Sequence, residues 1–176
     1  MPEPAGITEL LRSRIRDIPD YPQPGIVFKD ITPLLADGPA FAAVVAELGA
    51  GYPDVDKVAG IEARGFILAA PVALELKAGF VPVRKQGKLP AATYAQSYDL
   101  EYGSATLEVH TDAFGPGERV LVIDDVLATG GTAAATAELV RRCGATVAGI
   151  VVLLELGFLN GRGKLSGLPV RSLLVV

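Results

Sequence analysis

Residues 120–132 read VLVIDDVLATGGT, an apolar run that leads into two adjacent carboxylates and then into small and hydroxylated residues. Valine and isoleucine runs of this kind are typical of strands buried on both faces of a parallel sheet. We therefore predict a strand over 119–124 that delivers Asp124 and Asp125 to its exposed carboxyl end. A Gly-rich turn follows, and a helix is predicted over 131–143.

Strand and helix alternate on both sides of this stretch. Further strands are predicted over 57–61, 80–84 and 146–154, and a further helix over 65–77. The fold class is therefore α/β, with a central, mostly parallel, twisted sheet flanked by helices. Because such sheets bind ligands beyond the carboxyl ends of their strands, the loops at 62–65, 85–88 and 124–132 should converge on one site.

Two regions depart from this alternation. Residues 89–109 form a long excursion with two polar-alternating strands, and long loops in compact domains are usually functional. Near the amino terminus, apolar residues spaced as in a helix from Ile7 to Ile18 predict an amphipathic helix that ends at Pro19. The remaining predictions are strands over 93–100 and 105–109, an extended loop over 20–25 and a helix over 39–48.

Length and composition exclude several classes of protein. The chain has 176 residues, 50% hydrophobic and 20% charged, which predicts one globular domain over 1–176. The sequence contains no run of about 20 apolar residues, so no membrane span is predicted. A net charge of -4 disfavours nucleic acid as a partner. A single cysteine and a single histidine exclude an internal disulfide and a Cys/His zinc site. The start, MPEP, shows no secretory signal, so a cytoplasmic location is expected.

The residues after the predicted strand suit a phosphorylated sugar. Backbone N–H groups at the start of the helix can point at one phosphate, two hydroxyls can add donors, and two glycines allow close approach. The residues predicted to bind this phosphate are Ala128, Thr129, Gly130, Gly131 and Thr132. Asp124 and Asp125 would lie one sugar-length away, where they can accept hydrogen bonds from ribose hydroxyls directly or through Mg²⁺. The pattern is neither a Walker loop nor a dinucleotide fingerprint.

This stretch resembles the phosphoribosyl-diphosphate-binding motif of the type I phosphoribosyltransferases. Four further segments resemble the members of that family that act on adenine. They are PGIVFKDITPL at 24–34, GIEARGF at 60–66, RKQGKLP at 84–90 and SYDLEYG at 97–103. The resemblance implies a small hood at about 20–35, a flexible antiparallel lid at about 85–109, and a homodimer.

The hood is implied to bind the base. By the resemblance, Phe28 stacks on one face of adenine, Leu127 closes the other, and Val27 contributes main-chain hydrogen bonds. An aromatic ring stacks on any base, so Phe28 explains binding and not discrimination. Hypoxanthine, guanine, xanthine or a pyrimidine would keep the same chemistry. Taken alone, Phe28 in an Ile-Val-Phe run would be read as a core residue.

Four cations are implied to bind the diphosphate. Arg64 follows a predicted strand at the start of a helix, where free N–H groups also favour an anion. Arg84, Lys85 and Lys88 lie within five residues and resemble the clamp on the leaving group. From position alone, Arg64 could instead form a surface ion pair and the other three could line a solvated face. The family also implies a non-proline cis peptide between Glu62 and Ala63.

The implied reaction converts adenine and phosphoribosyl diphosphate to AMP and diphosphate. Mg²⁺ and the four cations would stabilise the departing diphosphate, while Asp124 and Asp125 would lie near the positive charge that develops on the ribose. The family offers Glu101 as the acid or base near adenine, and Tyr102 beside it in the lid. Glu101 could also simply be solvated. A second class of function, a non-catalytic regulator that senses the same sugar, would need a DNA-binding module for which no residues remain.

Overall fold

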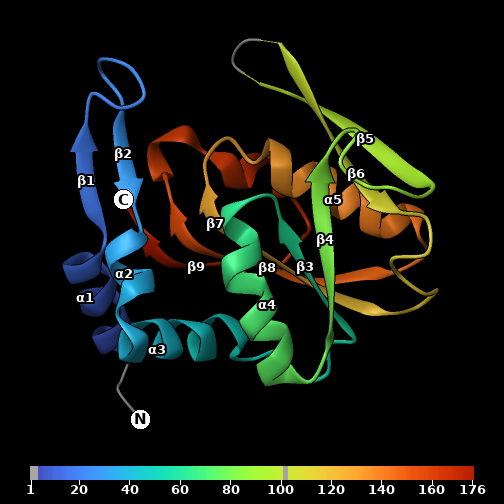
Figure 1. Ribbon diagram of the computed structural model, residues 1–176, viewed down its shortest axis with the longest axis horizontal. Coiled ribbons are helices and arrows are strands. Elements are labelled where there is room, and N and C mark those ends of the chain that lie inside the picture. The colour runs from blue at the N-terminus through green and yellow to red at the C-terminus, as the bar shows by residue number, and fades with distance from the viewer. Residues whose placement is uncertain (1–3, 101–102) are drawn as a thin grey trace. The chain divides into compact units, whose positions relative to one another are not determined.

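The computed structural model describes residues 4–100 and 103–176, which form two compact units, 1–47 and 48–176 (Figure 1). Across the described residues, no helix is both long and apolar enough to cross a membrane. The larger unit carries the predicted alternation of strands and helices, and the smaller one contains the residues predicted to form the hood, 20–35.

A seven-stranded sheet of order β5-β6-β4-β3-β7-β8-β9 forms the centre of the larger unit. Its parallel strands are β3 (Lys57–Ile61), β4 (Gly79–Lys85), β7 (Arg119–Leu127), β8 (Thr146–Glu155) and β9 (Val170–Val175). The antiparallel strands are β5 (Thr93–Asp99) and β6 (Ser104–His110), and β6 also pairs with β4. The α/β class and the antiparallel hairpin predicted within 89–109 are therefore confirmed.

Two helices cross over between parallel strands. Helix α4 (Arg64–Leu76) connects β3 to β4, and α5 (Gly131–Arg142) connects β7 to β8. The two connections lead away from the middle of the sheet in opposite directions, so right-handed crossovers place the helices on opposite faces. Figure 1 shows α4 in front of the sheet. The strand order reverses between β3 and β7, and this switch point is where open α/β sheets bind ligands.

Strand β7 is longer than the sequence indicated. It continues through both carboxylates to Leu127, which pairs with Glu155 of β8. The expectation that the strand ends at Asp124 was wrong, because β8 runs to Glu155 and offers backbone partners along this whole length. Successive side chains of a strand alternate in direction, but at this end of β7 the carboxylates of Asp124 and Asp125 both lie beside the first residues of α4.

The core of the larger unit lies between the sheet and its helices. Residues 120–123 of β7 are fully buried, and two of them, Val120 and Val122, belong to one cluster with the buried face of α5. Two short 3₁₀ helices, η1 (Gly157–Leu159) and η2 (Gly161–Leu165), connect β8 to β9. Leu165 of η2 also belongs to this buried cluster.

The smaller unit contains a two-stranded hairpin. Its elements are α1 (Pro4–Arg14), β1 (Arg16–Pro19), β2 (Val27–Asp30), α2 (Thr32–Ala36) and α3 (Gly38–Gly49), whose end reaches into the larger unit. The prediction of a helix through Ile18 was wrong, because residues 16–19 pair antiparallel with β2. Two ion pairs between the strands stabilise the hairpin, and helical spacing does not reveal them. Nη2 of Arg16 lies 2.6 Å from Oδ2 of Asp30, and Nζ of Lys29 lies 2.7 Å from Oδ1 of Asp17.

Candidate active site

The loops after β3, β4 and β7 converge at one edge of the sheet, as predicted. Nε of Arg64, at the start of α4, lies 2.8 Å from Oδ2 of Asp125 on β7. The carboxylate of Glu62, after β3, accepts a hydrogen bond of 2.9 Å from the backbone N–H of Lys85 at the end of β4. Residues that follow β3 therefore contact both β4 and β7 at the switch point.

The two carboxylates of β7 have different surroundings. Asp125 is only 4% exposed and forms its ion pair with Arg64. Oδ1 of Asp124 accepts a hydrogen bond of 2.9 Å from the backbone N–H of Asp125. Burial raises the pKa of Asp124 well above its ordinary value, and the neighbouring charge of Asp125 raises it further. Ionised Asp124 is therefore electrostatically unfavourable, and a cationic or hydroxyl-bearing ligand would stabilise it.

The first turn of α4 packs directly on β7. A Cβ atom at Gly65 would lie 2.9 Å from Oδ1 of Asp124, so a larger residue would not fit without a shift. No side-chain hydrogen bond caps the start of α4 or of α5 within the described chain. Uncapped helix starts leave N–H donors for an anion. The peptide bond between Glu62 and Ala63 is cis, as the family resemblance implied.

Arg84, near the end of β4, is paired with a carboxylate that sequence reasoning did not assign to the site. Glu62 lies 3.3 Å from Nε of Arg84, and Nη1 of Arg84 donates to the carbonyl of Lys88 at 3.0 Å. Burial opposes ionisation of Glu62, but the Lys85 N–H and the Arg84 guanidinium outweigh it and lower its pKa. Lys85 and Lys88 are exposed. The only signal for Glu62 in the sequence is its position directly after a buried strand.

The predicted phosphate loop lies between β7 and α5. Gly130 has φ +80°, a left-handed conformation that favours glycine, and α5 begins at the next residue. Gly130 and Gly131 are buried, whereas Ala128, Thr129 and Thr132 are half-buried. The loop therefore offers backbone and hydroxyl donors at a helix start, in the arrangement that the sequence predicted.

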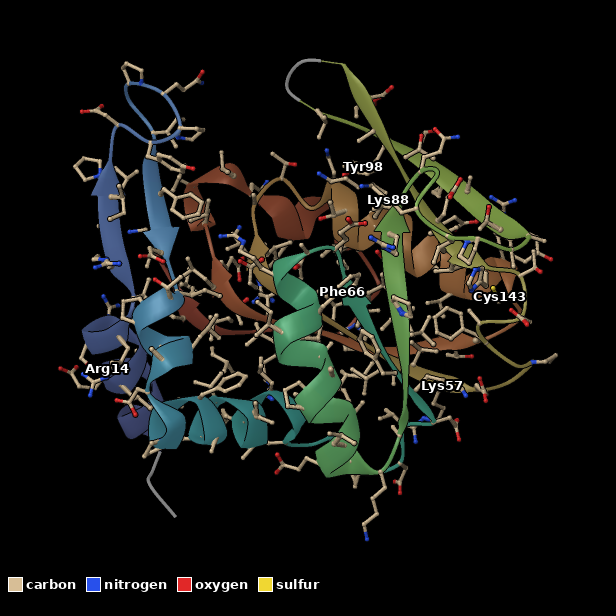
Figure 2. The ribbon with its side chains drawn as sticks, in the orientation of Figure 1. Arg14, Lys57, Phe66, Lys88, Tyr98 and Cys143 are labelled. Carbon is tan, nitrogen blue, oxygen red and sulfur yellow. The ribbon has the colours of Figure 1, made fainter. Side chains whose placement is uncertain are left out.

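The β5–β6 hairpin contacts this loop. A Cβ atom at Gly131 would lie 2.8 Å from Cδ2 of Tyr98, which is labelled in Figure 2. Burial, and then the negative charge of Asp124, raise the pKa of Tyr98. Arg142 of α5 anchors the hairpin through a 2.6 Å hydrogen bond to the carbonyl of Ala95. Glu101 and Tyr102, predicted for the lid, lie outside the described residues.

The predicted base-binding residues lie in different units. Val27 and Phe28 are on β2 of the smaller unit, where Val27 is 51% exposed. The Phe28 ring meets Tyr21 edge-on, with centroids 5.2 Å apart, a neighbour that the sequence reasoning missed. Leu127 is buried in the larger unit. Stacking of adenine between Phe28 and Leu127 stays a prediction.

The donor set suits a Mg²⁺ ion that arrives with its substrate. Among the residues that the structure describes, no three His, Cys, Asp or Glu side chains group around a possible metal position. Mg²⁺ commonly uses one or two carboxylates together with substrate phosphates and water. Asp124 and Asp125 fit that use, directly or through ribose hydroxyls and water.

Comparison with known proteins agrees with this geometry. The family model for the phosphoribosyl transferase domain matches residues 34–165. The chain therefore belongs to the phosphoribosyltransferase family, and within that family its relatives are adenine phosphoribosyltransferases. The adenine phosphoribosyltransferase of Streptomyces coelicolor is 64% identical, with 100% of both chains covered. That of a Nocardioides species is 63% identical, with 99% of this chain and 97% of the relative covered.

Solved structures lead to the same group. The crystal structure of adenine phosphoribosyltransferase from Rhodothermus marinus has a TM-score of 0.93 at 50% identity and covers 98% of this chain and 99% of that one. The Saccharomyces cerevisiae enzyme, solved with adenine and an imino-altritol bisphosphate, has a TM-score of 0.90 at 36% identity, with coverage of 96% and 99%.

Proposed function

We propose that this chain transfers the 5-phosphoribosyl group from phosphoribosyl diphosphate to adenine, releasing AMP and diphosphate. One observation carries the proposal: a paired Asp125 and Arg64 lie beside an uncapped helix start at the switch point of an α/β sheet. This arrangement supports the proposal, because a carboxylate suits a ribose, an arginine suits a diphosphate and free N–H groups at a helix start suit a phosphate.

The ribose and its 5-phosphate would bind along the β7–α5 connection. In this proposal, residues 128–132 donate backbone and hydroxyl hydrogen bonds to the 5-phosphate, and Asp124 and Asp125 accept hydrogen bonds from the ribose hydroxyls. As the anomeric carbon loses its leaving group, positive charge develops on the ribose ring. The negative charges of Asp124 and Asp125 would stabilise it.

The diphosphate would bind to the cations of the neighbouring loops. Arg64, Arg84, Lys85 and Lys88 would balance the negative charge that grows on the leaving group. Glu62 supports this role because it fixes both the Arg84 side chain and the Lys85 backbone. Bound Mg²⁺ would supply further electrostatic stabilisation of the diphosphate.

Adenine would bind at the hood, and a lid residue would move its proton. Val27 and Phe28 are proposed to hold the base, with Leu127 on its other face. Adenine loses the proton on N9 as that nitrogen forms the new bond, and Glu101 is proposed to accept it, with Tyr102 beside it. The solved Saccharomyces enzyme contains adenine, which supports adenine as the base. A homodimer and a cytoplasmic location are part of the proposal.

The test is nucleotide formation by the purified chain with Mg²⁺ and phosphoribosyl diphosphate. Adenine, hypoxanthine, guanine, xanthine, orotate and uracil would be offered separately. AMP formation with adenine alone is expected. Product with another base would overturn the specificity and keep the chemistry. Tight binding of the sugar diphosphate without product from any base would indicate the non-catalytic regulator.

The proposed role of Glu101 has its own test. Glu101→Gln should lower kcat about a hundredfold, within the range for loss of a general acid or base, and leave the affinity for phosphoribosyl diphosphate nearly unchanged. Glu75→Gln, at an exposed glutamate of α4, is the matched control and should keep full activity. An unchanged kcat in Glu101→Gln would dismiss the role.

A further inference from the structure

The phosphate loop rests on the backbone of a distant segment. Gly161, the first residue of η2, lies against the loop so closely that a Cβ atom at Gly130 would collide with the Gly161 carbonyl. In the reverse direction, a Cβ atom at Gly161 would collide with the Ala128 carbonyl and lie 3.1 Å from the Gly130 nitrogen. Two glycines thus meet backbone to backbone, and neither can carry a side chain without displacing the loop.

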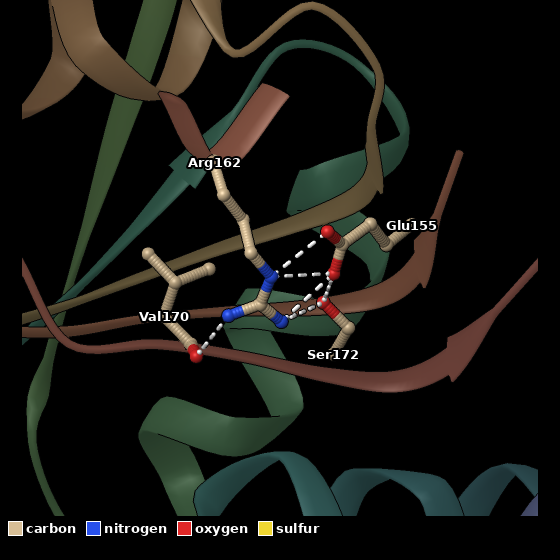
Figure 3. Close-up of polar contacts among 4 residues, drawn as sticks. All are labelled: Glu155, Arg162, Val170 and Ser172. Carbon is tan, nitrogen blue, oxygen red and sulfur yellow. Dashed lines mark hydrogen bonds and ion pairs between the residues drawn. The ribbon is translucent and has the colours of Figure 1, made fainter. Parts of the chain in front are cut away.

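The residue after Gly161 is held by a dense set of hydrogen bonds (Figure 3). Arg162 donates from Nε and Nη2 to the two carboxylate oxygens of Glu155, at 2.8 to 3.0 Å. Its Nη1 donates to the Val170 carbonyl at 2.8 Å, and its Nη2 donates to Ser172 Oγ at 3.1 Å. The Ser172 hydroxyl also donates to Glu155. One guanidinium therefore joins β8, β9 and η2.

The anchor of this cluster lies on the strand pair that carries the loop. Glu155 is only 6% exposed and is the backbone partner of Leu127, the last residue of β7. The backbone N–H of Leu156 donates to the Leu127 carbonyl at 2.9 Å. Two segments therefore start from the paired residues Leu127 and Glu155. They meet again where Gly130 contacts Gly161.

We propose that Arg162 is a positioning residue for the phosphate-binding loop. By fixing the segment that carries Gly161 to Glu155 and Ser172, it holds the Gly161 backbone against residues 128–130 and so sets the direction of their N–H groups. Arg162 touches no reacting atom in this role. The proposal rests on the proposed function, because it assigns the loop a phosphate to bind.

Arginine suits this task better than lysine. Its planar guanidinium presents several N–H donors in a fixed arrangement, which matches one carboxylate, one carbonyl and one hydroxyl at once. Although the Arg162 side chain is 46% exposed, its hydrogen bonds to three partners hold the backbone next to it in one conformation. Small displacements matter here, because a shift of about 1 Å in a binding group can cost about a hundredfold in rate.

The sharpest test adds one methyl group at the contact. Gly161→Ala should displace the loop and lower kcat/KM for phosphoribosyl diphosphate about a hundredfold. The KM for adenine should stay nearly unchanged. Gly163→Ala is the matched control in the same 3₁₀ helix, because its Cβ would lie 3.5 Å from Asn160 in ordinary contact. The control should keep full activity.

A second pair of variants tests the side chain itself. Arg162→Gln should raise the KM for phosphoribosyl diphosphate about tenfold, one step of about 1.4 kcal/mol, as expected when a group that orients a binding loop is lost. Arg162→Lys should restore only part of that loss. Arg141→Gln removes an exposed arginine of α5 and serves as the control. Binding of ribose 5-phosphate, measured by titration calorimetry, should weaken in parallel in the Arg162 variants.

The outcomes separate the two proposals. If Arg162→Gln lowers the melting temperature and leaves both KM values and ribose 5-phosphate affinity unchanged, the cluster only stabilises the fold and the inference is overturned. If Gly161→Ala behaves like Gly163→Ala, the inference is also overturned. If the unmodified chain neither binds ribose 5-phosphate nor forms AMP, the proposed function itself fails. Should Gly161→Ala not fold, Arg162→Lys still decides the matter through its KM values.

Discussion

The two loops of the larger unit that are proposed to bind the phosphate and the diphosphate are built in opposite ways. The loop between β7 and α5 is made of backbone, and Gly130 in it faces the backbone of Gly161. The loop after β4 is made of exposed cationic side chains, and a Cβ atom at Gly87 in it would meet nothing within 4 Å. The φ of Gly87, +79°, nearly equals the +80° of Gly130. The same backbone conformation thus serves a supported loop in one place and an open loop in the other.

The carboxylates beside these two loops also differ, because their surroundings shift their pKa values in opposite directions. Burial and a like charge raise the pKa of Asp124, so the free protein is destabilised by ionising it. The pKa of Glu62 is lowered by its N–H and guanidinium donors, so ionising it stabilises the fold. Ionised Asp124, beside the β7–α5 loop, is therefore poorly compensated in the free protein, whereas Glu62, beside the loop after β4, already has an N–H donor and a guanidinium as partners.

The largest difference between the two loops is expected when a methyl group is added to a glycine of each. Gly130→Ala should lower kcat/KM for phosphoribosyl diphosphate about a hundredfold, because the new Cβ would collide with the Gly161 carbonyl and shift the N–H groups. In Gly87→Ala the new methyl group has no steric conflict, so the only cost is that of a left-handed alanine, about 1–2 kcal/mol of stability. Its kcat/KM for phosphoribosyl diphosphate should fall a few-fold at most. Steady-state kinetics on both variants measures the contrast. Equal losses of kcat/KM in the two variants would contradict the contrast between the two loops.

Loss of one clamp side chain should have a smaller effect. Arg84→Gln should raise the KM for phosphoribosyl diphosphate about tenfold, since a hydrogen bond to a charged group contributes about 1.5–3 kcal/mol and the other three cations remain. The KM for adenine should not change. Initial rates at varied concentrations of each substrate give both constants, with Arg141→Gln as the control. An unchanged KM for the sugar diphosphate would remove Arg84 from the clamp.

The smallest effects are on stability, and they should have opposite signs. In the folded chain the raised pKa of Asp124 means that stability falls as pH rises above 3.8, the ordinary value, so Asp124→Asn should raise the melting temperature at pH 8. Glu62 stabilises above its ordinary 4.5 and loses that contribution as pH falls through its lowered value, so Glu62→Gln should lower the melting temperature at pH 8.

Each shift should be about 2–4 °C, the change that about 1 kcal/mol produces in a chain of this size. Thermal unfolding followed by circular dichroism at pH 3 and pH 8 measures both variants. The effect of Asp124→Asn should vanish at pH 3, where the carboxyl is protonated in the folded and the unfolded chain. Melting temperatures that move in the same direction at pH 8 would contradict the contrast between the two carboxylates.

Some elements were predictable because their pattern is local. The buried strands and the crossover helices follow from runs of valine and isoleucine and from helical spacing, and β3 was predicted at its observed bounds. Residues 16–19 were not predictable in this way, because Ile15 and Ile18 fit a helix while the partner that makes a hairpin lies at 27–30. The length of β7 was missed for a similar reason, since β8 supplies its last partners.

The sequence by itself determined the α/β class, the family resemblance and the residues that could touch a phosphoribosyl group, because Asp124, Asp125 and the glycines after them form one contiguous motif. Only the tertiary structure decided what holds that motif in place. Glu62 reaches Arg84, and Gly161 reaches Gly130, across separations at which sequence order carries no distance information. Hydrogen bonds between side chains and contacts between backbones depend on which loops the sheet brings together, and that is set by strand order.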